Sequence, residues 1–307
     1  MKKVFSFLIA AFVLVGFSAC SADKKGEEYP AEILDTKIES QPLSVVSLSP
    51  SLTEITYDLG FELTLDGVSD YCVMKNDDDA IKVGTMQNPK IDEILKIKPD
   101  VVITNAPLTG ADTNKLYQGD IDIVVVPVAT SVEGMWQQYD TLGTLYSGKV
   151  TGVVRAMAKY EPYKEKLDAM SKQNAEKSDE KTKGLLIAKK DFAIATGDTL
   201  LGNLLEHIGI DNIAKSGEKF GASTNDLSSA QVIFIADDID IADINSDEKL
   251  KNSPAVKNKM VFQIDVDGLL RGGFNSINIL EEMSSLVFGE DKADENTEKS
   301  EENQKTQ

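Results

Sequence analysis

Short apolar runs alternate with segments of helical spacing through the first half of the chain. The strand-like runs are Val45–Leu48, Val101–Thr104 and Ile121–Val126, and the helix-like segments are Leu52–Leu59 and Ile91–Ile97. Runs rich in valine and isoleucine suit strands that are covered on both faces, and alternation with helices indicates a mostly parallel sheet. This pattern predicts an N-terminal α/β lobe over residues 43–147.

The same pattern returns in the second half. Its strand-like runs are Leu185–Ala188, Phe192–Ala195, Val232–Ala236 and Met260–Ile264, and its helical segments are Leu200–Ile208 and Ile277–Val287. We therefore expect a second α/β lobe over residues 182–289. The expected fold class is α/β, with two lobes of mostly parallel sheet and a ligand cleft between them.

A long segment between the lobes, residues 148–181, has the composition of a helix. Thirty helical residues would span roughly 45 Å, enough to join two lobes as a rigid link. Pro162 lies inside this segment. Because an interior proline removes one hydrogen bond and clashes with the preceding turn, we expect a kink or a break near Glu161.

The first twenty residues have the form of an export signal. Two lysines precede Val4–Phe17, which has no charge and is too short to span a bilayer comfortably. Small residues then lead to Cys20, an arrangement that resembles the bacterial lipobox, in which the thiol is acylated, for instance with palmitate. Residues 1–19 would be the signal peptide, and the mature protein would be held on the outer face of the bacterial cell membrane. The alternative is ordinary secretion with a chance cysteine.

Polar, charged segments flank the two lobes. Residues 20–42 are expected to form a flexible tether, and residues 290–307, with seven acids and three lysines, a disordered tail. The formal charge is −19 and becomes about −21 once Lys2 and Lys3 are removed with the leader, since −19 − 2 = −21. This balance argues against binding to nucleic acid or to an anionic lipid surface through a basic face, because phosphate contacts need clustered lysine and arginine. Cys72 is left without a partner for an intrachain disulfide.

Residues with catalytic chemistry are scarce. His207 is the only histidine, and no nucleophile elbow, phosphate loop or zinc-protease motif is present. Asp77–Asp79 and Asp237-Asp238 read as solvated loop charges, so neither a metal site nor a cofactor is expected. A secreted serine hydrolase that uses Ser49 or Ser51 with His207 stays open as an alternative, but no catalytic residue is assigned.

Polar or small loops follow several of the predicted strands. They are Ser49-Pro50-Ser51, Ser69-Asp70-Tyr71, Gly84-Thr85, Asn105-Ala106-Pro107 and Thr196-Gly197-Asp198. In parallel α/β sheets, ligands bind beyond the carboxyl ends of the strands. Two lobes that face each other through such loops would enclose a site for a small molecule.

Several motifs have a familiar order. Leu48-Ser49-Pro50-Ser51-Leu52-Thr53-Glu54 is followed by Gly67-Val68-Ser69-Asp70-Tyr71-Cys72, by Val83-Gly84-Thr85 and by Asn88 to Val102, which reads NPKIDEILKIKPDVV. In this order the chain resembles the substrate-binding lipoproteins of ABC importers for iron complexes, haem and cobalamin. The resemblance runs from about Leu43 to Gly289 and is looser in the second lobe.

The resemblance implies two lobes joined by a long helix, with ligand held between them, and delivery to the transmembrane subunits of an ABC permease. It implies a ring-packing role for Tyr71 and permease docking through Asp92 and Asp226. The expected ligand-binding residues are Ser49, Pro50, Ser51, Ser69, Asp70, Tyr71, Gly84, Thr85, Ala106, Thr196 and Arg271.

Arginine is rare in this chain, and Arg271 is the only one after Arg155. A ferric siderophore of high charge, or haem with two propionates, would need more cations than that. We therefore expect a corrinoid such as cobalamin, or a weakly charged iron chelate, as the ligand. The protein is expected to be a monomer whose only membrane contact is its lipid anchor. A surface interaction protein that no longer serves transport is a further alternative.

Overall fold

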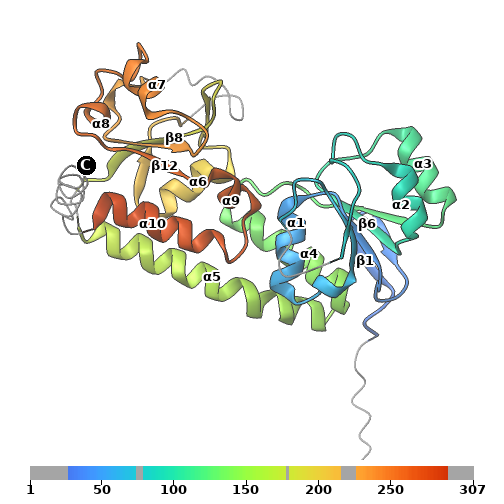
Figure 1. Cartoon of the computed structure of the whole chain (residues 1–307). Helices are drawn as coiled ribbons and strands as arrows, with labels where there is room; N and C mark the ends of the chain where they lie inside the picture. The colour runs from blue at the N-terminus through green and yellow to red at the C-terminus, as the bar shows by residue number, and fades with distance from the viewer. Residues whose placement is uncertain (1–26, 74–78, 178–179, 216–225, 290–307) are drawn as a thin grey trace, which may run out of the picture.

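The computed structural model describes residues 27–73, 79–177, 180–215 and 226–289. Two five-stranded sheets form the centres of two lobes, and one long helix runs beneath both of them (Figure 1). The predicted architecture of two α/β lobes with mostly parallel sheets is confirmed. No helix among the described residues has the length and apolar character needed to cross a membrane.

The sheet of the N-terminal lobe is parallel throughout, in the order β5-β4-β3-β6-β7. Its strands are β3 (Val45–Ser47), β4 (Leu65–Val68), β5 (Ile81–Lys82), β6 (Val101–Thr104) and β7 (Asp122–Val125). Its helices are α1 (Pro50–Leu59), the 3-10 turn η1 (Glu62–Thr64), α2 (Ile91–Ile97), α3 (Gly110–Gln118) and α4 (Val132–Ser147).

Each face of this sheet has its own core. Val45 and Val101 pack with the residues of α1 and α4, whereas their neighbours Val46 and Val102 pack with those of α2 and α3. Successive side chains of a strand point to opposite faces, so a strand covered on both sides needs apolar residues at every position. This is why the valine and isoleucine runs do not alternate with polar residues.

The expected tether is wrong for residues 27–42. Residues Ala31–Ile33 (β1) and Thr36–Ile38 (β2) form an antiparallel hairpin that packs against the N-terminal lobe. Ala31, Ile33 and Ile38 are buried, and the Thr36 hydroxyl donates a 2.7 Å hydrogen bond to the Ile123 carbonyl. The charged residues that suggested a tether alternate with these apolar ones and face solvent. Residues 1–26 and 290–307 lie outside the described residues, and the predictions for them stay predictions.

The sheet of the C-terminal lobe has the order β10-β8-β11-β12, all parallel, with β9 antiparallel to β8. Its strands are β8 (Thr182–Lys189), β9 (Ala193–Ile194), β10 (Ile210–Asn212), β11 (Val232–Ala236) and β12 (Val261–Ile264). Its helical elements are α6 (Leu200–His207), η2 (Leu227–Ser229), α7 (Ile241–Ser246), α8 (Pro254–Lys257), α9 (Val266–Arg271) and α10 (Ser276–Phe288).

The linking helix α5 runs from Thr151 to Ala175 without a break, and α10 lies along its second half (Figure 1). Of the kink or break expected near Glu161, the break is therefore wrong, because the helix continues through Pro162. Pro162 and Ala158, whose carbonyl loses its helical donor, are both exposed. Water can satisfy that carbonyl, so the proline costs the helix less than it would on a buried face.

Helices α4 and α5 cross at two glycines. A Cβ on Gly152 would lie 2.3 Å from the Gly143 carbonyl oxygen and 2.6 Å from the Thr144 Cα. Because these are backbone atoms, the helices cannot accommodate a methyl group by a rotamer change. The crossing attaches the N-terminal lobe to the first turns of α5.

The glycine crossing gives the first test. Gly152→Ala should lower the free energy of unfolding by about 1–3 kcal/mol, because overpacking outweighs the better helix propensity of alanine. Gly110→Ala is the matched control in a helix: its Cβ would meet nothing within 4 Å. Urea unfolding of both variants is the measurement, and equal stability of Gly152→Ala and wild type would contradict the tight crossing.

Buried tyrosines give a pH dependence. Burial raises the pKa of Tyr146 to about 12, against a hydrogen bond with Thr56 that lowers it. The unfolded chain titrates near pH 10, so this contribution is complete below about pH 10 and is lost as the pH rises toward 12. Unfolding free energies measured by urea titration across this range should fall by about 3 kcal/mol for Tyr146 alone, and Tyr146→Phe should flatten the slope. A slope that Tyr146→Phe leaves unchanged would contradict the assignment.

Candidate functional site

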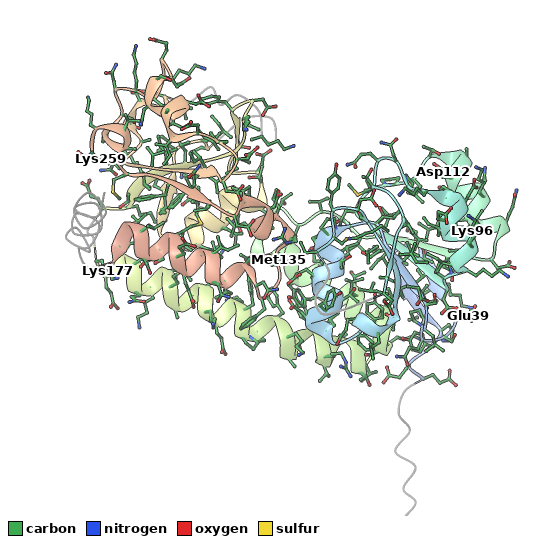
Figure 2. All side chains as sticks on the ribbon, viewed as in Figure 1. Glu39, Lys96, Asp112, Met135, Lys177 and Lys259 are labelled. Carbon is green, nitrogen blue, oxygen red and sulfur yellow. The ribbon has the colours of Figure 1, made fainter. Side chains whose placement is uncertain are left out.

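The two lobes meet where α1 faces the loop that follows α9. A narrow cavity of about 20 Å³ lies there, with Met135 at its wall (Figure 2). This is room for roughly one water. The cavity, here called the junction cavity, is lined by Ser51, Ile55, Val128, Ala129, Met135, Gln138, Leu200, Leu270, Arg271, Gly272 and Gly273. A larger ligand must lie among the loops around it, or separate the lobes.

Asn105 fixes the turn between β3 and α1. Its Oδ1 accepts hydrogen bonds from both Ser49 and Ser51, the latter at 2.9 Å, and its Nδ2 donates to the Val126 carbonyl at 2.9 Å. Pro50 occupies the first turn of α1, where the missing N–H costs nothing. Ser49 is buried in this network, whereas Ser51 reaches the junction cavity. Of the two hydroxyls, only that of Ser51 is placed to meet a ligand there.

The loop after β4 is stabilised by hydrogen bonds within the lobe, and one of its side chains, that of Tyr71, is exposed to solvent. Asp70 and Gly84 exchange two bonds, from the Asp70 amide to the Gly84 carbonyl at 2.7 Å and from the Gly84 amide to Asp70 Oδ1 at 3.2 Å. Lys82 Nζ donates to the carbonyls of Ser69 and Cys72. Ser69 is buried, but the Tyr71 side chain is 69% exposed. Tyr71 is thus presented on a rigid loop.

Gly84 and Thr85 form a tight turn beside that loop. Gly84 has a φ of +90°, and a Cβ there would lie 2.5 Å from the Asn88 carbonyl oxygen. Thr85 and Asn88 exchange backbone hydrogen bonds of 3.2 and 3.1 Å, and the Thr85 hydroxyl also accepts from the Asn88 amide. The turn therefore buttresses the Asp70 loop.

Ala106 and Thr196 take different positions. Ala106 is half-buried, and both its amide and its carbonyl bond the Thr104 hydroxyl. Thr196 is fully buried, and its hydroxyl donates to Asp198. In this structure the Thr196 side chain belongs to the interior of the C-terminal lobe, and the Thr196 carbonyl accepts a 2.8 Å hydrogen bond from the Thr199 hydroxyl, which in turn caps α6 by accepting from the Gly202 amide. Its predicted contact with a ligand would require that loop to open.

Arg271 lies at the end of α9 and lines the junction cavity opposite Ser51. Its guanidinium is 3.3 Å from Asp265 Oδ2, and the other oxygen of that carboxylate caps α9 through the Gly268 amide. The positive charge is therefore partly neutralised within its own lobe. Arg271 remains the one cation that the structure places at the junction cavity.

Two carboxylates of α1 hold the loop after α9. Asp58 Oδ2 accepts from the Tyr139 hydroxyl and, at 2.9 Å, from the Phe274 amide, while Glu54 Oε1 accepts from Asn275 Nδ2. Gly273 fits between them with a φ of +69°, and a Cβ there would lie 2.8 Å from Asp58 Oδ2. Burial and the neighbouring Asp58 charge raise the pKa of Tyr139 well above its usual value. The tyrosine thus stays a donor at neutral pH.

Sequence reasoning missed Asn105, Glu54 and Asp58 as parts of the site. Asn105 stands in the polar loop predicted after β6, in which the expected ligand contact is its neighbour Ala106. Glu54 ends the motif that opens α1, yet its burial against the other lobe follows from a contact 221 residues away in sequence. Asp58 is one turn further along the same helix face, a spacing that pairs it with Glu54.

The expected docking acids lie on the surfaces of different lobes. Asp92 is exposed at the start of α2 and borders a groove of about 410 Å³ between α2 and α3. Asp226 caps η2, and its hydrogen bonds with Ser228 lower the pKa of its carboxyl. Cys20, the expected lipidation site, lies outside the described residues.

The arrangement offers little for catalysis. The Ser49 and Ser51 hydroxyls bond Asn105 rather than a histidine, and His207 stands at the end of α6 in the other lobe. Among the described residues, no group of three His, Cys, Asp or Glu side chains could hold a metal ion. What the site provides is a set of rigid loops around the junction between two lobes.

Known proteins are similar to this chain over most of its length. The sequence model of the family described as periplasmic binding protein matches residues 45–267. An uncharacterized ABC transporter substrate-binding lipoprotein of Bacillus subtilis, YvrC, is 24% identical over 305 residues, 92% of this chain and 95% of the relative. A cobalamin-binding protein of Halobacterium salinarum is 23% identical over 111 residues, 35% of this chain and 30% of the relative.

Solved structures show the same fold at low sequence identity. The periplasmic heme binding protein HutB of Vibrio cholerae superimposes with a TM-score of 0.69 at 19% identity, over 80% of this chain and 99% of that one. The periplasmic vitamin B12 binding protein BtuF of the same species superimposes with a TM-score of 0.61 at 21% identity, over 80% of this chain and 96% of that one. Because the family match covers most of both lobes and well over half of the residues, this chain belongs to the periplasmic binding protein family.

Proposed function

We propose that this protein is the ligand-binding component of an ABC importer. It captures a corrinoid or a weakly charged iron chelate between its lobes and delivers it to the permease without catalysis. The proposal rests chiefly on one observation: rigid loops at the carboxyl ends of β3, β4 and β6 present Ser51 and Tyr71 on the same lobe that meets Arg271 at the junction cavity. This is the position at which parallel α/β sheets bind ligands.

The charges near the site favour a ligand of low net charge. Arg155 lies away from the site in the first turns of α5, where it donates to the Leu59 carbonyl and lies over the Phe61 ring, 4.9 Å from its centroid. Arg271 shares its charge with Asp265, and Lys90 stands 4.0 Å from Asp70. A ligand with several carboxylates would need cations that are not already paired. A bulky neutral macrocycle needs instead an exposed aromatic ring such as Tyr71.

The relatives support a role in ABC import and a location outside the cell membrane. The Bacillus relative is described as a substrate-binding lipoprotein, and the solved neighbours bind heme, vitamin B12 or, for BauB, a ferric siderophore complex. We place the protein on the outer face of the cell membrane, attached through acylated Cys20, as a monomer that docks on permease subunits through Asp92 and Asp226.

A panel of ligands tests the proposal. Purified protein is heated with cyanocobalamin, cobinamide, haem and ferric siderophores of differing charge. A ligand at a hundred times its Kd stabilises the folded state by about 2.7 kcal/mol, which corresponds to a rise in Tm of roughly 5–10 °C for a chain of this size. We expect the shift with a corrinoid or a weakly charged chelate. Absence of a shift with every compound would contradict the proposal.

Tyr71 should contribute to affinity without contributing to stability. Tyr71→Ala removes an exposed ring from the ligand, so Kd should rise about tenfold while Tm of the free protein stays unchanged. Tyr71→Phe should keep most of the affinity. Tyr117→Ala, which removes another half-exposed ring on α3, is the matched control and should leave Kd unchanged. Isothermal titration with the ligand found above decides the matter, and equal Kd values for Tyr71→Ala and Tyr117→Ala would remove Tyr71 from the site.

Asp92 should act after binding. Reversal of its charge in Asp92→Lys should leave Kd within twofold of wild type and abolish uptake of labelled ligand by cells, because the permease cations would then face a cation. Glu165→Lys, an exposed charge reversal on α5, controls for net charge. Loss of ligand affinity in Asp92→Lys, or normal uptake, would show that this residue is not a docking contact.

A further inference from the structure

An exposed apolar stripe runs along the first turns of α5. Val150 is 57% exposed, Val154 64% and Met157 45%. The spacing i, i+4, i+7 places these three side chains on one face of the helix. We call them the α5 stripe. Leu63 of η1, two residues after the Phe61 ring over which Arg155 lies, is 91% exposed and adds to the apolar surface at this end of the molecule.

The charges around the stripe differ from those of the rest of the protein. The chain has 51 acids in 307 residues, yet none between Thr141 and Tyr160, and this stretch contains Lys149, Arg155 and Lys159. The nearby carboxylate of Glu28 is occupied, because it accepts from the amides of Val150 and Thr151 and from the Thr151 hydroxyl. An apolar helix face flanked by lysine and arginine matches a surface of anionic lipid headgroups.

The N-terminal end of the described chain lies at the same place. Glu28 caps the first turn of α5, and its carbonyl accepts from the Lys149 amide at 3.2 Å. Figure 1 shows the chain entering the N-terminal lobe on the side where α5 begins. Eight residue steps separate Glu28 from Cys20. No chain of that length reaches further than about 29 Å, so an acylated Cys20 keeps the start of α5 close to the membrane.

We propose that the α5 stripe rests on the outer surface of the membrane that carries the lipid anchor. The inference depends on the proposed attachment at Cys20, and it replaces the expectation that the lipid anchor is the only membrane contact. The stripe inserts its apolar side chains between headgroups while Lys149 and Lys159 meet lipid phosphates. A single acyl chain or a small apolar patch binds membranes weakly alone, whereas two such signals on one molecule reinforce each other.

This contact sets the orientation of the lipoprotein. Asp92 lies on α2, and the sheet separates α2 and α3 from α1, α4 and α5. While the stripe contacts lipid, Asp92 faces away from the membrane. The protein must therefore leave the lipid surface before that acid can dock on a permease, so the stripe holds a ligand-collecting state distinct from the docked one.

A site-specific probe tests the contact without any acylation. The chain from Ser21 carries a hexahistidine tag in place of Cys20 and is bound to vesicles of phosphatidylethanolamine and phosphatidylglycerol that contain a nickel-chelating lipid. An environment-sensitive fluorophore is attached at Val154→Cys or, as matched control, at Val128→Cys, which is 62% exposed beside the junction cavity. We expect a blue shift, and quenching by brominated acyl chains, for the probe at 154 and neither for the probe at 128.

Two variants sharpen the test. With the probe kept at 154, Val150→Ser with Met157→Ser should remove the quenching, and Lys149→Glu with Lys159→Glu should weaken it on phosphatidylglycerol vesicles. Equal signals at 154 and 128, or no quenching at 154, would overturn the inference. So would a concentration-dependent dimer in sedimentation velocity that Val154→Asp abolishes, because the stripe would then bind a second copy. Mass spectrometry of the N-terminal peptide from cell membranes tests acylation of Cys20 separately.

Discussion

The carboxylate of Asp58 joins two lobes that share no strand. It accepts one hydrogen bond from Tyr139 of its own lobe and one from the Phe274 amide of the other, while Glu54 on the same helix bonds Asn275. Two buried or half-buried acids would be costly at such a junction if they lacked donors. Here the donors are a phenol, an amide N–H and a carboxamide, none of which carries a charge. These contacts across the junction are thus hydrogen bonds from neutral donors to carboxylates rather than ion pairs, and they add to an apolar core that continues from one lobe into the other.

The position of α5 follows from this arrangement. Its first turns are fixed to the N-terminal lobe through the glycine crossing with α4, and its second half lies along α10 of the C-terminal lobe. Ser276, which begins α10, bonds the Tyr163 hydroxyl at 3.3 Å directly after the loop that Asp58 and Glu54 hold. A helix anchored at both ends, with a short bonded loop between its partners, permits only small rotations of one lobe against the other.

The sequence predicted the lobes well because their strands are covered on both faces. Val45 and Val46 pack into different cores, so every position of such a strand has to be apolar, and the run is visible without a partner. It predicted Pro162 poorly, since the cost of an interior proline depends on whether the freed carbonyl can reach water. It predicted the β1–β2 hairpin poorly as well, because three-residue strands whose solvent-facing residue is charged have the composition of a linker.

The site shows the same division between local and distant information. Ser49, Ser69 and Thr196 have the residue types of ligand contacts, but in the structure their hydroxyls or backbones support the loops themselves. A polar residue after a strand can either bind ligand or hold the loop that binds it, and the sequence does not separate the two. Burial does. Because Ser69 and its neighbours are committed to the loop, Tyr71 stands on a support that does not have to be ordered when ligand arrives. Such preorganisation would lower the entropic cost of the ligand binding that we propose. The exposed ring on one lobe and the partly neutralised cation on the other are the reasons for proposing a large ligand of low charge rather than a compact, highly charged one.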